Sequence, residues 1–465
     1  MIATPALADD LREALVLAYN TNPNLQAARA AQRAVDESVP IARSASLPSL
    51  SGTASFTELM KQSTPNVASP DRVLGASATL GMPLYAGGGI RNSIRAAKTR
   101  VEAGQADLRG AETGVFSAVV AAYMDVILAE AVVKLNRGNV GVLEVNLQAT
   151  QDRFEIGDLT RTDVAQSQAR LSLVKGQARS AEANLIAARE RYIQIVGKAP
   201  VDLQAPPALP GLPASVDEAV TTALDNNPDL IAARQRSKAA GFDSNAAGAG
   251  RMPRISVFTG ADYSDYLGTN GGPASAVTRQ GFTSATAGVR ATIPLFQGGL
   301  PAAQQRQAQA REGATLEQEI AIEREVIASV RAAYASWSAS SDIIASTQSA
   351  VDAAALSLEG VRAENTVGNR TILEILNAEQ ELLGAQVQLA TARRNAYVAG
   401  FNLLAAMGKA EARDLGLDGG ALYDPETNYQ RVRNQIWDWS TDPDPRAVGT
   451  RTVDTAPQDG SVTGQ

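Results

Sequence analysis

Two acidic side chains of this chain stand in the same local context, three residues after a threonine: Asp163 follows Thr160, and Glu374 follows Thr371. This spacing is a capping box, in which the carboxylate accepts a hydrogen bond from the backbone N–H at the start of a helix. Spacing alone therefore predicts that both carboxylates cap the start of a helix.

The residue types of the chain exclude most catalytic chemistry. The 465 residues contain no Cys and no His, which excludes disulfides, thiolate chemistry, zinc sites of the usual kind and His-based triads. The glycines at 87–89 lack the spacing of a dinucleotide-binding loop, and no Gly-rich turn is followed by Lys-Ser or Lys-Thr. The net charge of −7, without a basic stripe, argues against nucleic acid as a partner. The sequence therefore predicts a protein that is not an enzyme, with no cofactor and no metal.

The chain contains the same strand-to-helix junction twice. Residues 81–88 (GMPLYAGG) return as residues 292–299 (TIPLFQGG), with Pro83 and Pro294 separated by 211 positions. Proline donates no hydrogen bond to a sheet and ends a strand, while glycine permits the sharp turn into a helix. The predicted junction residues are Pro83, Gly87, Gly88, Pro294, Gly298 and Gly299.

The duplication extends over most of the chain. The offset of 211 also relates Gly157 to Gly368, and upstream an offset of 205 relates Asn22-Pro23 to Asn227-Pro228. A repeat at a fixed offset indicates two copies of one structural unit. We predict a first repeat at 10–199, a Pro-rich joint at 200–213, a second repeat at 214–409, a C-terminal segment at 410–439 and a tail at 440–465. The tail is rich in Asp, Pro, Thr and Gly, and we expect it to be disordered.

Each repeat is predicted to begin with a helix and continue with a β-hairpin, at about residues 45–87 and 252–298. In the second strand of each hairpin, apolar residues alternate with Gly, Ser and Thr, so that each strand has one apolar and one polar face. Strands of roughly ten or more residues have the length of membrane β-strands, although a strand of a soluble sandwich fits the same alternation. Arg290 lies on the polar face, either as a charge in a lumen or as an exposed cation at a loop end.

Each repeat ends in a long helical hairpin, predicted at residues 88–197 and 299–408. A first helix of some 65 to 70 residues spans roughly 100 Å, which is far longer than a helix of an ordinary globular domain. Gly157 and Gly368 are expected to end these helices in the left-handed conformation. The returning helices are shorter, so the helix at the start of each repeat is a candidate to fill the remaining length.

The start of the chain resembles the end of a signal peptide. Ala6-Leu7-Ala8 fits the small-residue pattern before a cleavage site, and residues 1–9 are interpreted as a signal-peptide remnant. The longest apolar run, residues 116–133, is broken by Asp125 and Glu130, so no membrane-spanning helix is predicted.

Four strands with one apolar face do not close a barrel within one chain. An open sheet in lipid would leave the N–H and C=O groups of its edges unpaired, at a cost of several kcal/mol each. Membrane strands of this chain would therefore have to share a barrel with other copies, with eight strands from two chains or twelve from three. The sequence thus predicts a mainly α fold with a membrane β-barrel and long coiled-coil-like helices.

The paired Pro-Leu-Tyr/Phe-x-Gly-Gly blocks, the Asn-Pro-x-Leu blocks and the Gly-x-x-Thr turns resemble the TolC family of outer-membrane channel proteins, over roughly residues 10 to 410. The resemblance implies a homotrimer with a twelve-stranded barrel in outer-membrane lipid of a Gram-negative bacterium and a helical barrel in the periplasm. It implies two kinds of partner, a periplasmic adaptor (membrane fusion) protein and an inner-membrane ABC transporter or proton-driven efflux pump. The block at 429–439 resembles the branch that serves type I protein secretion. A multidrug efflux duct and a soluble periplasmic coiled-coil scaffold are the alternatives.

The resemblance also implies roles for residues at the helical turns. The turns would form the periplasmic end that contacts the adaptor, and the channel would narrow there. The tip residues by this correspondence are Gly157, Leu159, Thr160, Gly368 and Thr371. The resemblance implies that the gate residues are Asp163, Arg370, Glu374 and Asn377. For Asp163 and Glu374 two roles stay open, helix capping alone and capping combined with a role in the pore. Asn377 stands where the family has a second acidic residue, and Asn365 stands where it has a tyrosine latch, so a less acidic and less tightly latched gate is expected.

Aromatic residues near the strand ends are expected to form a girdle at the lipid interface, although core packing beneath the junction is favoured for two of them, Tyr85 and Phe296. The other members of this set are Phe258, Tyr263, Tyr266 and Phe282.

Overall fold

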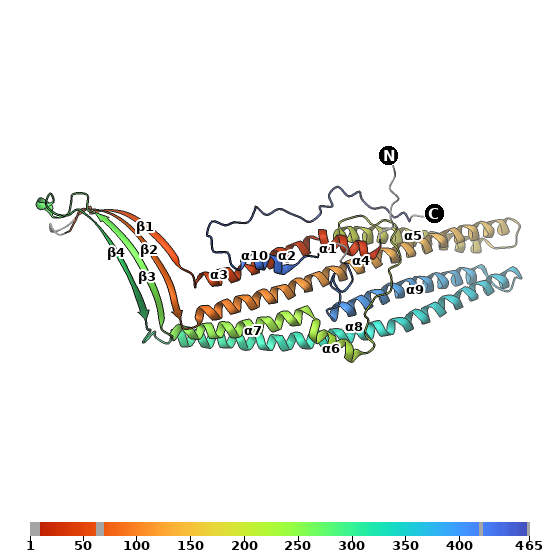
Figure 1. Ribbon diagram of the computed structural model, residues 1–465. Helices are drawn as coiled ribbons and strands as arrows, with labels where there is room; N and C mark the ends of the chain where they lie inside the picture. Colours follow the sequence, from red (N-terminus) through yellow and green to blue (C-terminus); the bar gives the residue numbers. More distant parts are fainter. Residues whose placement is uncertain (1–9, 62–68, 418–421, 463–465) are drawn as a thin grey trace.

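The protein is elongated, with a β-sheet at one end and long helices running away from it (Figure 1). The computed structural model describes residues 10–61, 69–417 and 422–462, so the interpretation of residues 1–9 as a signal-peptide remnant lies outside the described residues. Two pairs of strands and two long helical hairpins follow each other in the order that the duplication predicts.

The four strands form one antiparallel sheet in the order β1-β2-β3-β4. Their bounds are β1 Ser49–Glu58, β2 Arg72–Ala86, β3 Arg254–Asp265 and β4 Gly281–Thr292. The hairpin of each repeat therefore pairs with the other through β2 and β3. Because β1 and β4 are the edges, their outer backbone groups have no partner strand among the described residues.

The strand register gives the sheet one apolar face and one polar face. Residues directly opposite each other in antiparallel strands share a face. Leu50 lies opposite Leu80, and Val257 lies opposite both Met82 and Val289, on an apolar face. The other face carries small and polar residues at opposed positions, namely Ser51, Thr79, Gly260 and Thr286.

Several predictions for the strand aromatics are wrong. Phe258 lies opposite Gly288, and Phe282 lies opposite Ser264, so both belong to the polar face and not to a lipid girdle. Tyr85 pairs with Ile255 on the apolar face after an irregularity at Pro83, and its exposed fraction is 49%. Phe296 is 89% exposed. Neither of these two packs in a core beneath the junction of this chain.

Glycines turn the chain sharply from strand to helix at both junctions. Gly87 and Gly88 have φ values of 62° and 82°, and Gly298 and Gly299 have 61° and 81°. Residues with a Cβ rarely adopt this left-handed conformation, which accounts for the repeated glycine pair. A long helix of 67 residues starts directly after each pair, α4 Gly89–Glu155 and α8 Leu300–Thr366.

Each long helix returns through a shorter one, α5 Arg161–Val196 after α4 and α9 Ile372–Ala406 after α8. Shorter helices lie along the part of α4 and α8 that the returns do not reach, as Figure 1 shows. Their bounds are α1 Leu11–Thr21, α2 Pro23–Asp36, α3 Ser38–Ser44, α6 Val216–Asn226 and α7 Pro228–Gly248. Asn22 and Asn227 cap α2 and α7 through their side chains, directly before the repeated proline.

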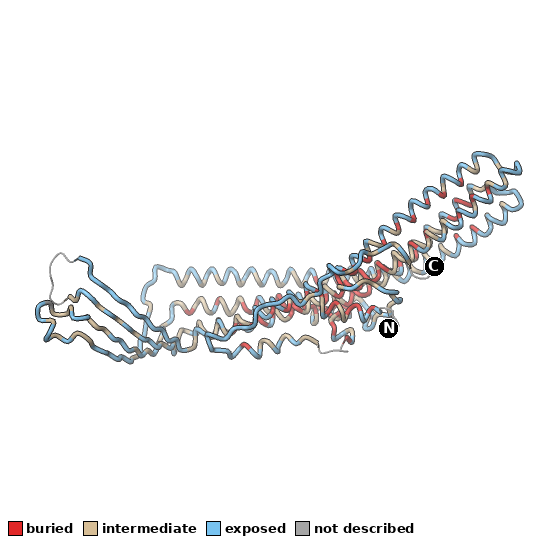
Figure 2. The backbone as a smooth tube through the Cα atoms, turned by 90° about the horizontal axis from the view of Figure 1, so that it is seen from above, coloured by how far each residue is buried: buried red, intermediate tan, exposed pale blue. Residues whose placement is uncertain are grey.

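The largest apolar core lies midway along the helices, where buried residues gather in Figure 2. Phe116, Val119, Val120 and Tyr123 of α4 have no exposed surface there. Contrary to the sequence-based expectation, α4 is long and apolar enough to cross a membrane by length and composition. Part of this apolar stretch, 39% of it, is buried in the core of the described chain.

The C-terminal part returns along the helices. The helix α10 Pro425–Val432 packs against α2, and Arg431 pairs with Asp442 at 2.8 Å. Residues 440–462 contain no helix or strand, but they lie against α1, α4 and α5.

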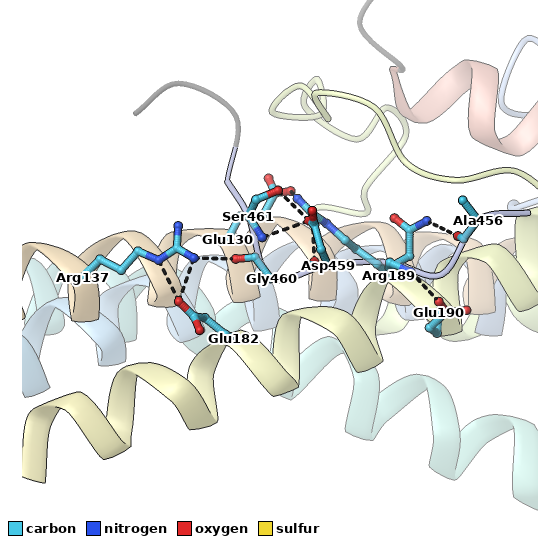
Figure 3. Close-up of polar contacts among 10 residues, drawn as sticks. Glu130, Arg137, Glu182, Arg189, Glu190, Ala456, Asp459, Gly460 and Ser461 are labelled. Atoms are coloured by element: carbon cyan, nitrogen blue, oxygen red, sulfur yellow. Dashed lines mark hydrogen bonds and ion pairs between the residues drawn. The ribbon is translucent and has the colours of Figure 1, made fainter.

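These tail contacts differ from the predicted disorder, and they are mainly polar (Figure 3). Arg189 of α5 donates to the Asp459 carbonyl at 3.0 Å and to Glu130 of α4 at 2.7 Å. Arg137 of α4 donates to the Gly460 carbonyl at 2.9 Å and to Glu182 at 2.7 Å. Apolar content did not predict these contacts, because they join backbone carbonyls of the tail to the buried Arg189 and the half-buried Arg137.

Candidate functional site

The tip of the first hairpin is held by the capping box that the sequence predicts. Asp163 accepts hydrogen bonds from the Thr160 N–H at 2.9 Å and from the Thr160 hydroxyl at 2.7 Å. Gly157, with φ of 83°, ends α4, and Leu159 is half-buried beside it. These hydrogen bonds lower the pKa of Asp163, the side-chain bond from Thr160 most of all.

The tip of the second hairpin repeats this arrangement and adds an ion-pair chain. Glu374 accepts from the Thr371 N–H at 2.8 Å and from Arg370 at 2.6 Å. Arg370 also donates to Glu364 at 2.6 Å, and its carbonyl accepts from Asn365 at 2.7 Å. The structure therefore brings Arg370 and Glu374 together as an i,i+4 ion pair at the start of α9.

The environment of Glu374 favours its ionised form. The backbone hydrogen bond from Thr371, followed by the side-chain bonds from Arg370 and Thr371, lowers the pKa of Glu374 to about 2. Crowding of three such carboxylates in a ring would act in the opposite direction and raise the apparent pKa values. Within one chain, capping and pairing prevail.

Asn377 does not join this cluster. Its side-chain oxygen accepts from Arg170 of α5 at 2.9 Å, and the same guanidinium donates to Gln380. Arg170 thus links the first hairpin to the second. Arg170 was not predicted from the sequence, because no local spacing relates a residue of α5 to one on α9 in the other repeat.

A second link between the hairpins lies near the first. Glu379 of α9, only 5% exposed, accepts from Arg362 at 2.8 Å and from Asn146 of α4 at 2.9 Å. Leu143, Leu171 and Leu376 pack into one apolar cluster beside it. The two hairpins are therefore joined just before their tips by two polar links and an apolar contact.

Two apolar side chains stand out at the tips themselves. Ile156 and Val367 occupy equivalent positions of the two repeats, directly before Gly157 and Gly368. Their exposed fractions are 80% and 70%. The duplication offset of 211 would have located this pair from the sequence.

The sheet and the helices together define a class of protein. A sheet with one apolar face, set on paired helices of about 100 Å, is the subunit of an outer-membrane channel with a helical tunnel. The sequence profile described as "Outer membrane efflux protein" matches residues 14–198 and 219–409, and the chain belongs to this family.

Relatives and solved structures agree with this assignment. The outer membrane efflux protein BepC of Brucella suis is 33% identical over 95% of this chain and 94% of its own length. Outer membrane protein TolC of Escherichia coli is 29% identical over 68% of this chain and 65% of its own length. The alkaline protease secretion protein AprF of Pseudomonas aeruginosa is 28% identical over 67% of this chain and 65% of its own length.

The crystal structure of the CmeC outer membrane channel of Campylobacter jejuni has a TM-score of 0.75. The match covers 91% of this chain and 89% of the CmeC chain at 16% identity, and it supports the fold alone. The predicted TolC-like fold, a barrel-forming sheet on a helical tunnel, is confirmed. The protein is located in the outer membrane of a Gram-negative bacterium, with its helices in the periplasm.

Proposed function

We propose that three copies of this chain form the exit duct of a tripartite export system. The observation that carries the proposal is the open four-stranded sheet with an apolar face and two unpaired edges. Lipid provides no hydrogen-bond partners for these edges, so β1 of one copy has to pair with β4 of the next. Two copies would give an eight-stranded barrel that side chains fill, whereas three copies give twelve strands and room for a channel.

The tips are proposed to contact a periplasmic adaptor protein, which in turn connects the duct to an inner-membrane ABC transporter or proton-driven pump. The exposed Ile156 and Val367, at the far end from the sheet, support this assignment. Exposed apolar side chains at equivalent positions provide a repeated docking point for a partner. Gly157, Leu159, Thr160, Gly368 and Thr371 would shape the turns around them.

The exported cargo is proposed to be protein, by type I secretion. The relative AprF is named for secretion of alkaline protease, and the block at 429–439 supports the same branch. Multidrug efflux is the second candidate, because BepC is an efflux protein by name and matches nearly the whole chain. Family membership sets aside the soluble scaffold. No catalytic role is proposed.

Subunit assembly is testable with introduced cysteines, since the chain has none of its own. Thr53→Cys on β1 and Thr286→Cys on β4 place thiols on the polar face of the two edges. A bifunctional thiol reagent should give trimers from the double variant and only monomers from each single variant. Monomers throughout, together with no conductance in planar bilayers, would overturn the proposed duct.

The two candidate cargoes differ in what a deletion strain loses. Type I secretion predicts that specific proteins disappear from the culture medium while drug susceptibility stays unchanged. Raised susceptibility to several unrelated drugs with an unchanged set of secreted proteins would favour efflux instead.

A further inference from the structure

A hollow of about 630 Å³ lies at the junction of sheet and helices, lined by polar-face residues of the strands and also by Tyr85 and Ile255 of the apolar face. Pro83, Ser256, Arg254 and Arg290 line it from the sheet, and the first turns of α4 and the end of α7 line it from the helices. Within the described part of the chain, none of the lining residues is an Asp or a Glu.

The strand register directs both arginines to this face. Arg254 lies opposite Thr292, and Arg290 lies opposite Ser256, two positions along the same pair of strands. Neither arginine forms an ion pair or a side-chain hydrogen bond with another described residue. The Arg290 guanidinium carbon instead lies 5.0 Å from the centre of the Phe258 ring. This leaves the N–H groups of both side chains free for a ligand.

Gly288 is needed for this arrangement. A Cβ at Gly288 would lie 3.1 Å from the Phe258 ring, so the ring covers β4 only because position 288 has no side chain. An arginine stacked on an aromatic ring keeps its guanidinium edge available for hydrogen bonding.

The surroundings of the hollow are also positive. Both long helices begin here, and their N-cap residues Gly88 and Gly299 provide no side-chain cap. Both N-termini present the positive end of the helix dipole, although at α8 the Leu300 N–H is bonded to the Gln297 carbonyl and Pro301 has no N–H to offer. Arg91 and Arg95 extend the positive charge along α4. Asp243 is already paired with Arg100.

We infer that this hollow binds oxyanions, as carboxylate or phosphate groups of cargo that passes through the channel. Guanidinium forks bind both groups in bidentate fashion, and helix N-termini favour the same charge. The inference rests on the proposed function, because the polar face is a lumen only when the strands close a barrel. Three copies would place six arginines in one belt, opposite in sign to the carboxylates at the tips.

Block of single-channel current by inositol hexakisphosphate is the proposed test, with purified channels in phosphatidylcholine bilayers. We expect block of the wild type, and a concentration for half-block that rises about tenfold or more in Arg254→Gln/Arg290→Gln, given the strength of charged hydrogen bonds. Arg254→Lys/Arg290→Lys should keep part of the block. Arg279→Gln removes a charge just before the start of β4, at the end of the strand away from the hollow, and should leave the block unchanged.

Equal block in the wild type and the double Gln variant would overturn the binding site while leaving the channel function intact, since conductance is measured at the same time. A difference in block between the wild type and the double Gln variant that appears only when phosphatidylglycerol is added would identify a lipid headgroup as the ligand and also overturn the assignment to cargo.

Arginine modification by phenylglyoxal provides a readout without mutation. Inositol hexakisphosphate should protect Arg254 and Arg290 of the wild type, and modification at an unchanged rate would contradict the inference.

Discussion

At the scale of single residues, the tip carboxylates show how one side chain serves two roles. Glu374 completes a capping box and also holds Arg370 at 2.6 Å. Its pKa of about 2 lies below the ordinary value of 4.5, so the carboxylate stays charged at any physiological pH. A charged group at a proposed constriction influences ion flow even when its structural role is only to cap a helix.

Replacement of Glu374 by Gln separates these roles. Gln keeps the capping geometry, so folding should be almost unchanged, while loss of three carboxylates per trimer should lower cation selectivity and weaken block by multivalent cations. The measurement is the reversal potential in a salt gradient across a planar bilayer. Glu364→Gln removes the other, more exposed acidic partner of Arg370 and is the matched control. Unchanged selectivity in Glu374→Gln would leave a helix cap and no pore role.

The lowered pKa also predicts the pH dependence of selectivity. An acid with a depressed folded pKa loses its charge, and the stability its contacts provide, only as pH falls through that folded pKa. Cation selectivity of the wild type should therefore persist from neutral pH to about pH 3–4. Loss of selectivity between about pH 5 and 7 would instead show that repulsion within the ring governs the titration.

At the scale of elements, the sheet is defined by its two faces. Val289 lies on the apolar face with 68% exposure, and Thr286 lies on the polar face of the same strand. Gly288 also lies on the polar face, but a larger residue there would clash with the Phe258 ring that covers it. Neighbouring positions of β4 therefore lie on opposite faces of the sheet and have different surroundings and different packing neighbours.

An arginine scan of β4 tests the two faces. Ala287→Arg, on the apolar face near the middle of β4, should destabilise the assembled barrel by roughly 2–4 kcal/mol, the cost of an arginine near the bilayer midplane. Thr286→Arg should assemble nearly as well as the wild type, since it points to the polar face. Heat-resistant trimers in membrane extracts provide the measurement. Comparable assembly defects in both variants would contradict the two-faced sheet.

The C-terminal tail stabilises the helices through only a few contacts. Arg189 is 10% exposed and shares its guanidinium between Glu130 and Asp459. Truncation after Ser440 should leave the channel folded and inserted, but it removes the Asp459 and Gly460 carbonyls from two arginines. Faster amide exchange is expected in α4 and α5 around residues 130–137 and 182–190. Asp454→Asn, in the same tail, is the control, and unchanged exchange after truncation would show that the tail contacts contribute no stability.

At the scale of the whole molecule, the sequence predicted the architecture because duplication and periodicity are local and repeated. The glycine pairs at 87–88 and 298–299 and the capping boxes at both tips follow from spacing alone. Arg170 with Asn377 and Phe258 over Gly288 did not follow, because these contacts join residues 207 or 30 positions apart without a repeated pattern. The docking of the tail escaped prediction because backbone carbonyls, which every residue has, carry it.

The links between the hairpins suggest how the molecule changes state. In the proposed duct, opening of the periplasmic end would separate the α4–α5 hairpin from the α8–α9 hairpin near the tips. Arg170, which bonds Asn377 and Gln380, opposes this movement. These bonds are partly solvated, so together they contribute about 1 kcal/mol. That is a factor of roughly five in the closed-to-open equilibrium.

Arg170→Gln should therefore raise the resting conductance of channels in planar bilayers, by increasing the open fraction severalfold from a low value. Arg161→Gln is the matched control, because Arg161 is an exposed arginine at the start of the same helix with no side-chain bond to α9 among those described. Asn377→Asp strengthens the link by adding a carboxylate opposite Arg170 and should lower the open fraction. The three variants change charge at the same tip, so a purely electrostatic effect would alter conductance similarly in Arg170→Gln and Arg161→Gln. That result, or an unchanged open fraction in Arg170→Gln, would show that the link does not hold the hairpins together.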